Sequence, residues 1–176
     1  MKENGRVKLF LTFAVVAGFA LFFFLSSDRE PNKSGKIEVR GDGECKNITA
    51  NALLELEKAP GRHLDYVRER IGIIECAEKG SGIYVWEKPP RFVVGERTYK
   101  TNTTLKLYAS AIVHDACHVE QYYSSRSYSG EMAEKECLEK QYRALEEIGG
   151  TAEELGLVRS ALEKRYWEIP FEERSW

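Results

Sequence analysis

The sequence lacks a basic stripe, an internal repeat and a C-x-x-C motif, and it has only three histidines in 176 residues. Its 26 Lys and Arg nearly balance its 28 Asp and Glu, which gives a net charge of -2. Because no basic surface or nucleic-acid-binding module is evident, no nucleic-acid partner is expected. Without C-x-x-C spacing, a closed structural zinc site built on cysteine is a weaker alternative for the chain's thiols.

One long hydrophobic run is present near the N-terminus. Residues 9–25 are apolar or small apart from Thr12, and about 17 to 25 such residues cross the hydrocarbon core of a bilayer. The basic flank at 1–8 predicts a cytoplasmic N-terminus and an extracytoplasmic remainder. We therefore predict a single-pass signal anchor in a cell membrane, with the lipid bilayer as the partner of residues 9–25. A cleaved signal peptide is the alternative, although the run ends in Phe22 to Leu25 without an A-x-A-like cleavage site.

The chain after the anchor divides into a polar stretch and one domain. Residues 26–43 contain one proline and three glycines among charged residues, a composition that favours a linker. Residues 44–176 then have the length of a single domain of ordinary size.

The periodicity of the domain predicts both helices and strands. Thr49 is expected to cap a helix, a second short helix is expected over 62–71, and Thr151 with Glu154 fits a capping box that opens another. Three stretches rich in β-branched and aromatic residues predict a small antiparallel sheet, and these are 71–76, 82–86 and 91–100. The expected fold class is therefore α+β.

The most informative motif is His114-Asp115-Ala116-Cys117-His118. Apolar residues from Leu105 onward recur with the 3.6-residue period of a helix. His114 and His118 therefore project from one helical face, where two imidazoles can bind a single metal ion. Asp115 occupies the position of the glutamate in H-E-x-x-H, which takes a proton from zinc-bound water.

A zinc ion that performs catalysis needs a third protein ligand, and the next predicted helix offers three glutamates. Glu134 is in helical phase with Leu138 and Leu145 and so faces inward. Glu136 falls on the solvated side, where charge pairing is its expected role. Glu131 shares the inward phase but lies at the helix start, where acidic residues are common for other reasons. We take Glu134 as the ligand and Glu131 as its reserve.

These features resemble the small gluzincin-type zinc metallopeptidases, whose pattern is H-E-x-x-H on one helix and E-x-x-A or similar on the next. The resemblance covers residues 104–149, with H-D-A-C-H and E-K-E-C in the places of the two motifs. It implies a zincin-like domain that binds Zn²⁺ through His114, His118 and Glu134. It also implies hydrolysis of a peptide or protein substrate, with Asp115 as the general base.

The departure from the family pattern is Asp115, one methylene shorter than glutamate. Its carboxylate would fall about 1 Å short of the water that it must polarise, enough to reduce the rate greatly. The alternative function is a non-catalytic, membrane-tethered binding or structural protein that keeps the zincin-like fold.

The four cysteines form an even set compatible with two disulfides in an oxidising compartment, and they are Cys45, Cys76, Cys117 and Cys137. Three connectivities exist. Cys117 follows His114 by three residues and Cys137 follows Glu134 by three. If those two ligands converge, a Cys117–Cys137 bridge would join their helices, and Cys45 would pair with Cys76. Free buried cysteines are the alternative.

Overall fold

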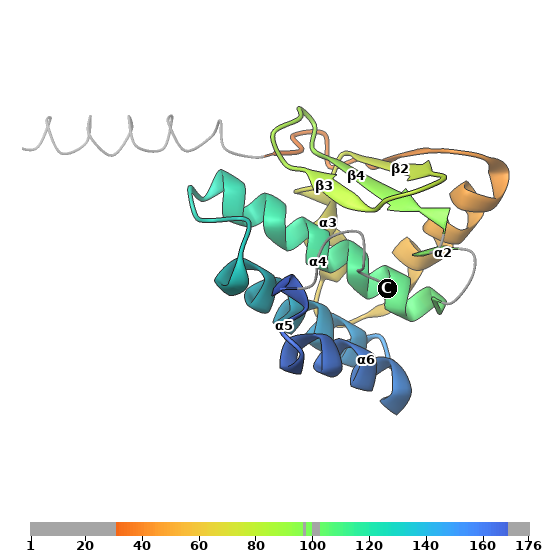
Figure 1. The fold of residues 1–176 in the computed structure, drawn as a ribbon. Coiled ribbons are helices and arrows are strands. Elements are labelled where there is room, and N and C mark those ends of the chain that lie inside the picture. Colours follow the sequence, from red (N-terminus) through yellow and green to blue (C-terminus); the bar gives the residue numbers. More distant parts are fainter. Residues whose placement is uncertain (1–30, 97, 100–102, 169–176) are drawn as a thin grey trace, which may run out of the picture. The chain divides into compact units, whose positions relative to one another are not determined.

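The computed structural model describes residues 31–96, 98–99 and 103–168, which belong to a compact unit spanning 31–176. The expected membrane anchor at 9–25 lies outside the described residues. Within the described ranges, no helix combines the length and the hydrophobicity needed to cross a membrane. This part of the chain forms a four-stranded sheet and five α-helices (Figure 1).

The sheet is mixed. Its strands are β1 (Glu38–Arg40), β2 (Ile73–Ala77), β3 (Gly82–Tyr84) and β4 (Arg91–Gly95), and their order is β1-β2-β4-β3. β2 runs parallel to both β1 and β4, whereas β3 pairs antiparallel with β4. The prediction of an antiparallel sheet was therefore wrong. β3 pairs on the far side of β4, so β2 and β4 lie side by side and parallel, and α2 and α3 connect β1 to β2 in a second parallel pair.

The described part of the expected linker, 31–43, contributes to this domain. It contains β1. The side-chain nitrogen Nδ2 of Asn32 donates to the backbone carbonyls of Lys36, Arg68 and Ile71 at 2.8, 2.7 and 3.0 Å. The Asn32 side chain is buried. These bonds attach the stretch to the domain, so it does not act as a spacer over these residues.

Helix α2 (Gly43–Lys58) begins earlier than predicted. Asp42 is its N-cap and accepts a hydrogen bond from the Cys45 backbone at 2.8 Å. Thr49, which was expected to cap this helix, lies inside it. The Thr49 hydroxyl is instead 3.0 Å from that of Tyr108, within hydrogen-bond distance, and joins α2 to α4. Helix α3 (His63–Arg68) follows.

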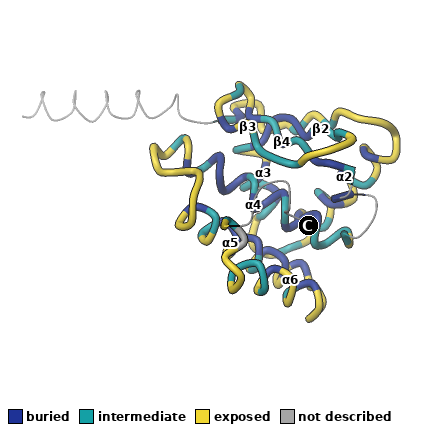
Figure 2. The backbone as a smooth tube through the Cα atoms, in the orientation of Figure 1, coloured by how far each residue is buried: buried dark blue, intermediate teal, exposed yellow. Residues whose placement is uncertain are grey.

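Helix α4 (Leu105–Tyr123) is the central element of the domain, and it contacts α2, α3, α5 and β3. Buried residues occur along most of the length of α4 (Figure 2). Helix α5 (Glu131–Glu147) packs on α4, and α6 (Ala152–Glu163) packs on α5. The capping box of Thr151 and Glu154 at the start of α6 is confirmed. A short 3₁₀ helix, η3 (Tyr166–Glu168), also contacts α5 and α6.

Both predicted disulfides are present. Cys45–Cys76 joins α2 to β2, and Cys117–Cys137 joins α4 to α5. Disulfides persist mainly in oxidising compartments, so they indicate an extracytoplasmic domain.

Candidate metal centre

Three side chains on α4 and α5 converge on one point. His114 Nε2 lies 3.1 Å from His118 Nε2, and these two atoms lie 3.4 and 3.6 Å from Glu134 Oε2. Helical spacing explains the pairing of the histidines, since residues four apart lie one above the other on the same face. The packing of α5 on α4 then brings Glu134 to them. Together they form a His/His/Glu group that can hold a metal ion.

The three distances match those of a tetrahedral metal site. With ligand bonds of about 2.0–2.1 Å, two donor atoms on a tetrahedron lie about 3.3 Å apart. Each measured separation, 3.1, 3.4 and 3.6 Å, is close to this value. The donor set therefore fits one metal ion in tetrahedral coordination without rearrangement of the helices.

The group is largely buried. His114 and His118 are each 5% exposed, while the Glu134 side chain is 16% exposed and is the most accessible of the three. Catalysis at such a group also requires that water or substrate reach the fourth position of the metal.

Burial and hydrogen bonding act in opposite directions on the pKa values of this group. Burial lowers the pKa of His114 and favours its neutral form, which is the form that binds metals. Burial opposes ionisation of Glu134, but hydrogen bonds from both histidines outweigh it and lower the pKa of Glu134. Burial also acts to lower the pKa of His118, yet the bond with Glu134 raises it overall.

Asp115 is electrostatically coupled to the same group. Burial, the largest cause, raises the pKa of Asp115 to about 7, and the charge of Glu134 raises it while that of His118 lowers it. A carboxylate of this basicity suits proton transfer near neutral pH. A bound cation would lower that pKa, since positive charge favours the ionised form.

The other two glutamates of α5 have different partners. Glu131, the reserve ligand, accepts a hydrogen bond from Arg165 at 2.7 Å and is half exposed. Glu136 accepts one from Arg126 at 2.7 Å, the charge pairing that its helical phase predicted. Glu134 alone of the three belongs to the group with the histidines.

One functional candidate was missed by sequence reasoning. Gln121 lies one turn after His118 on α4, and its Oε1 is 3.2 Å from Nδ1 of that histidine. A polar residue three positions after a ligand, within an otherwise buried helical stripe, was the signal that could have identified it. Hydrogen bonds to the second nitrogen of a ligating histidine commonly fix its orientation.

The fold and this group define an α+β domain with two disulfides and a three-residue candidate metal centre. Comparisons with protein-family models, with curated proteins and with solved structures found no match to this chain. The resemblance to gluzincin-type peptidases is thus supported by the His/His/Glu group and by no relative.

Proposed function

We propose that this protein is a membrane-anchored zinc metallopeptidase whose domain acts outside the cytosol. The observation that carries the proposal is the convergence of His114, His118 and Glu134 from two helices at tetrahedral spacing. Two imidazoles and one carboxylate are a donor set typical of catalytic zinc, and they leave a fourth position for water. The two disulfides and the hydrophobic run at 9–25 support the location.

The proposed chemistry is hydrolysis of a peptide bond. When bound, zinc polarises the scissile carbonyl and lowers the pKa of water. Asp115 would accept the proton that the attacking water releases and return it to the leaving amine. Its electrostatic coupling to His118 and Glu134 supports this role.

The sheet offers a surface suited to an extended peptide. β3 is an edge strand, paired only with β4 within the described sheet, and it packs beside α4. An extended chain adds to such an edge through backbone hydrogen bonds. This arrangement favours a peptide or protein substrate over a small molecule.

One feature favours a second function. Aspartate has a shorter reach than glutamate, and a displacement of about 1 Å in a catalytic group can reduce the rate about 100-fold. A non-catalytic protein that uses its metal for binding or for structure would tolerate this change. The two functions differ in whether Asp115 is needed for hydrolysis.

The first test is the metal content of the full chain, purified in mild detergent without chelator or metal-affinity resin. We expect about one zinc per chain by elemental analysis, and none in a His114→Ala, His118→Ala variant. The matched control is His63→Ala, because the third histidine pairs with Glu147 at 2.8 Å on a different part of the fold. Absence of zinc from the wild type, even after zinc is supplied, would reject the metal centre.

The second test separates catalysis from binding. Asp115→Ala should abolish cleavage in a peptide-library screen, and Asp115→Glu should preserve or raise it, while all three forms retain zinc. Equal cleavage by the wild type and Asp115→Ala would reject the proposed mechanism. Retained zinc without cleavage in any form would favour the binding function.

A further inference from the structure

We propose that Gln121 is a positioning residue of this metal centre, which keeps the Nε2 lone pair of His118 directed at the ion. The inference depends on the proposed metal centre and adds a residue to it. Gln121 does not face the ion itself. It acts through His118, and its own orientation is fixed by α5.

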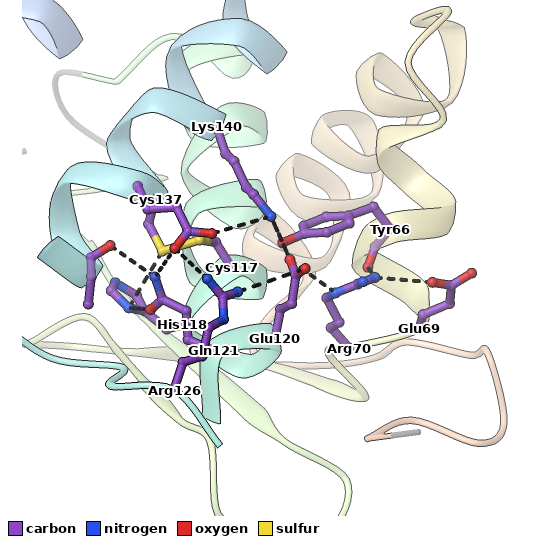
Figure 3. Close-up of polar contacts among 12 residues, drawn as sticks. Tyr66, Glu69, Arg70, Cys117, His118, Glu120, Gln121, Arg126, Cys137 and Lys140 are labelled. Carbon is purple, nitrogen blue, oxygen red and sulfur yellow. Dashed lines mark hydrogen bonds and ion pairs between the residues drawn. A yellow bond between two sulfur atoms is a disulfide. The ribbon is translucent and has the colours of Figure 1, made fainter. Parts of the chain in front are cut away.

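The contacts of Gln121 use both ends of its amide. Oε1 is 3.2 Å from His118 Nδ1, while Nε2 donates to the Ala133 carbonyl and to Glu136 Oε2, each at 3.1 Å. Figure 3 shows Gln121 and His118 side by side on α4, close to the cystine that joins α4 to α5. The side chain is 1% exposed, so water cannot substitute freely for these partners.

These contacts allow only one orientation of the amide. If the amide were flipped, its oxygen would face two further acceptors, the Ala133 carbonyl and the Glu136 carboxylate. The amide oxygen must therefore face His118. In neutral His118 this oxygen requires a hydrogen on Nδ1, which leaves the lone pair on Nε2. Nε2 is the atom that lies 3.1 Å from His114 Nε2.

Glu136 is itself held in place by Arg126. The Arg126 guanidinium donates to Glu136 Oε2 at 2.7 Å. The Arg126 backbone nitrogen donates to the backbone carbonyl of Gln121 at 2.9 Å. The result is a chain of contacts from exposed Arg126 to buried His118, with Gln121 as the link between α4 and α5.

The sulfur of Cys137 is the other group near Nδ1, at 3.7 Å. It belongs to a disulfide, and sulfur is a weak acceptor at this distance. Gln121 is therefore the group that favours a hydrogen on Nδ1, while Glu134, 3.6 Å from Nε2, favours one on Nε2 when no metal is bound.

The chain provides a matched control in its second buried glutamine. Gln141 is also 1% exposed, and it lies on α5 in the same interface between helices. Its Nε2 is 3.5 Å from Ser110 Oγ, which is not a proposed ligand. Gln141→Leu therefore removes a buried amide without disturbing His118.

The experiment measures zinc affinity of the full chain in detergent by competition with a chromophoric chelator. Gln121→Leu should weaken zinc binding by roughly 10- to 100-fold, the usual effect of losing an outer partner of a ligating histidine. Gln141→Leu should stay within about threefold of the wild type. Glu136→Ala, which releases the Gln121 amide, should be intermediate, with exposed Glu139→Ala as its control.

A second readout does not depend on zinc. In the metal-free protein at mildly alkaline pH, the ring ¹⁵N shifts of His118 should show a larger share of the Nδ1-protonated tautomer in the wild type and in Gln141→Leu. Gln121→Leu and Glu136→Ala should shift the balance towards a hydrogen on Nε2, which faces Glu134. A purely structural role for Gln121 would change stability without changing this signal, and Glu136→Ala keeps the test available if Gln121→Leu fails to fold.

The outcomes separate this inference from the proposed function. If the wild type binds zinc and Gln121→Leu binds it as tightly, the positioning role is rejected while the metal centre stands. If the wild type binds no zinc, the metal centre is rejected and the positioning role falls with it. An unchanged tautomer in Gln121→Leu would also overturn the inference.

Discussion

The two disulfides connect different regions of the domain, and only one of them lies beside the candidate metal centre. Cys45–Cys76 joins α2 to the sheet, whereas Cys117–Cys137 joins the two helices that carry the ligands. Cys117 is adjacent to His118 in sequence, and Cys137 lies one turn after Glu134. The first bond therefore joins elements of the fold, and the second also constrains the separation of the helices that carry the proposed ligands.

The loops that the two bonds close are similar in length, with sequence separations of 31 and 20. Chain entropy predicts that each contributes about 3–4 kcal/mol to the free energy of unfolding. Stability alone should thus hardly distinguish them. Their difference is expected in metal binding, because the geometry of a ligand set is sensitive to the spacing of its helices.

The largest expected effect comes from removing each disulfide in turn. Cys117→Ala with Cys137→Ala should lose about 3 kcal/mol of stability and weaken zinc binding by roughly 10-fold or more, because the ligand helices can then separate. Cys45→Ala with Cys76→Ala should lose about the same stability and keep the zinc affinity of its folded fraction. Denaturant unfolding measures the first quantity, and chelator competition measures the second.

These two variants serve as controls for each other, since each loses one disulfide. Equal zinc affinity in both folded variants would show that the Cys117–Cys137 bond does not align the ligands. Equal loss of affinity would show that the whole domain, and not this helix pair, maintains the metal centre.

A smaller effect is expected from the hydrogen bond between α2 and α4. Tyr108→Phe removes the contact of its hydroxyl with that of Thr49, at 3.0 Å in the buried interface. We expect a loss of about 1 kcal/mol in the free energy of unfolding and no change in zinc affinity. Exposed Tyr122→Phe is the control. A weaker zinc affinity in Tyr108→Phe would show that the region of α2 also supports the metal centre.

The convergence of the His/His/Glu group was predictable because helical periodicity is a strong local signal. Spacing of four places both histidines on one face, and phase with Leu138 separates Glu134 from Glu136. Gln121 was not predicted, because its role depends on the Ala133 carbonyl and Glu136, which α5 brings from another part of the chain.

The strands were predictable but their arrangement was not. β3 and β4 lie within two of the stretches that composition indicated, and β2 extends one residue beyond the third. β1 is only three residues of a charged, glycine-containing stretch. Such a short strand has no recognisable alternation. An antiparallel sheet is the default interpretation of strands joined by short connections, but β3 pairs on the far side of β4 and leaves β2 and β4 parallel. The parallel pairing of β1 with β2 depends on their connection through α2 and α3, which cannot be recognised without β1. Thr49 shows the same limit, since Asp42 provides an equally good cap about two turns earlier.

The smallest effect is expected at Glu154, which links the start of α6 to α4 without a covalent bond. Its carboxylate accepts hydrogen bonds from the Thr104 hydroxyl and from the Thr151 backbone.

Burial acts to raise the pKa of Glu154, but these bonds outweigh it and lower that pKa. A carboxyl with a lower pKa in the folded state stabilises the protein above its unfolded pKa, about 4.3, and this contribution is lost as the pH falls through the folded value. Glu154→Gln keeps an acceptor oxygen and loses only the charge, so it should cost about 0.5 kcal/mol near neutral pH. The difference from the wild type in urea unfolding should shrink in acid, whereas exposed Glu153→Gln should show little effect. A difference that stays constant with pH would mean that packing, and not the charge of Glu154, joins these two helices.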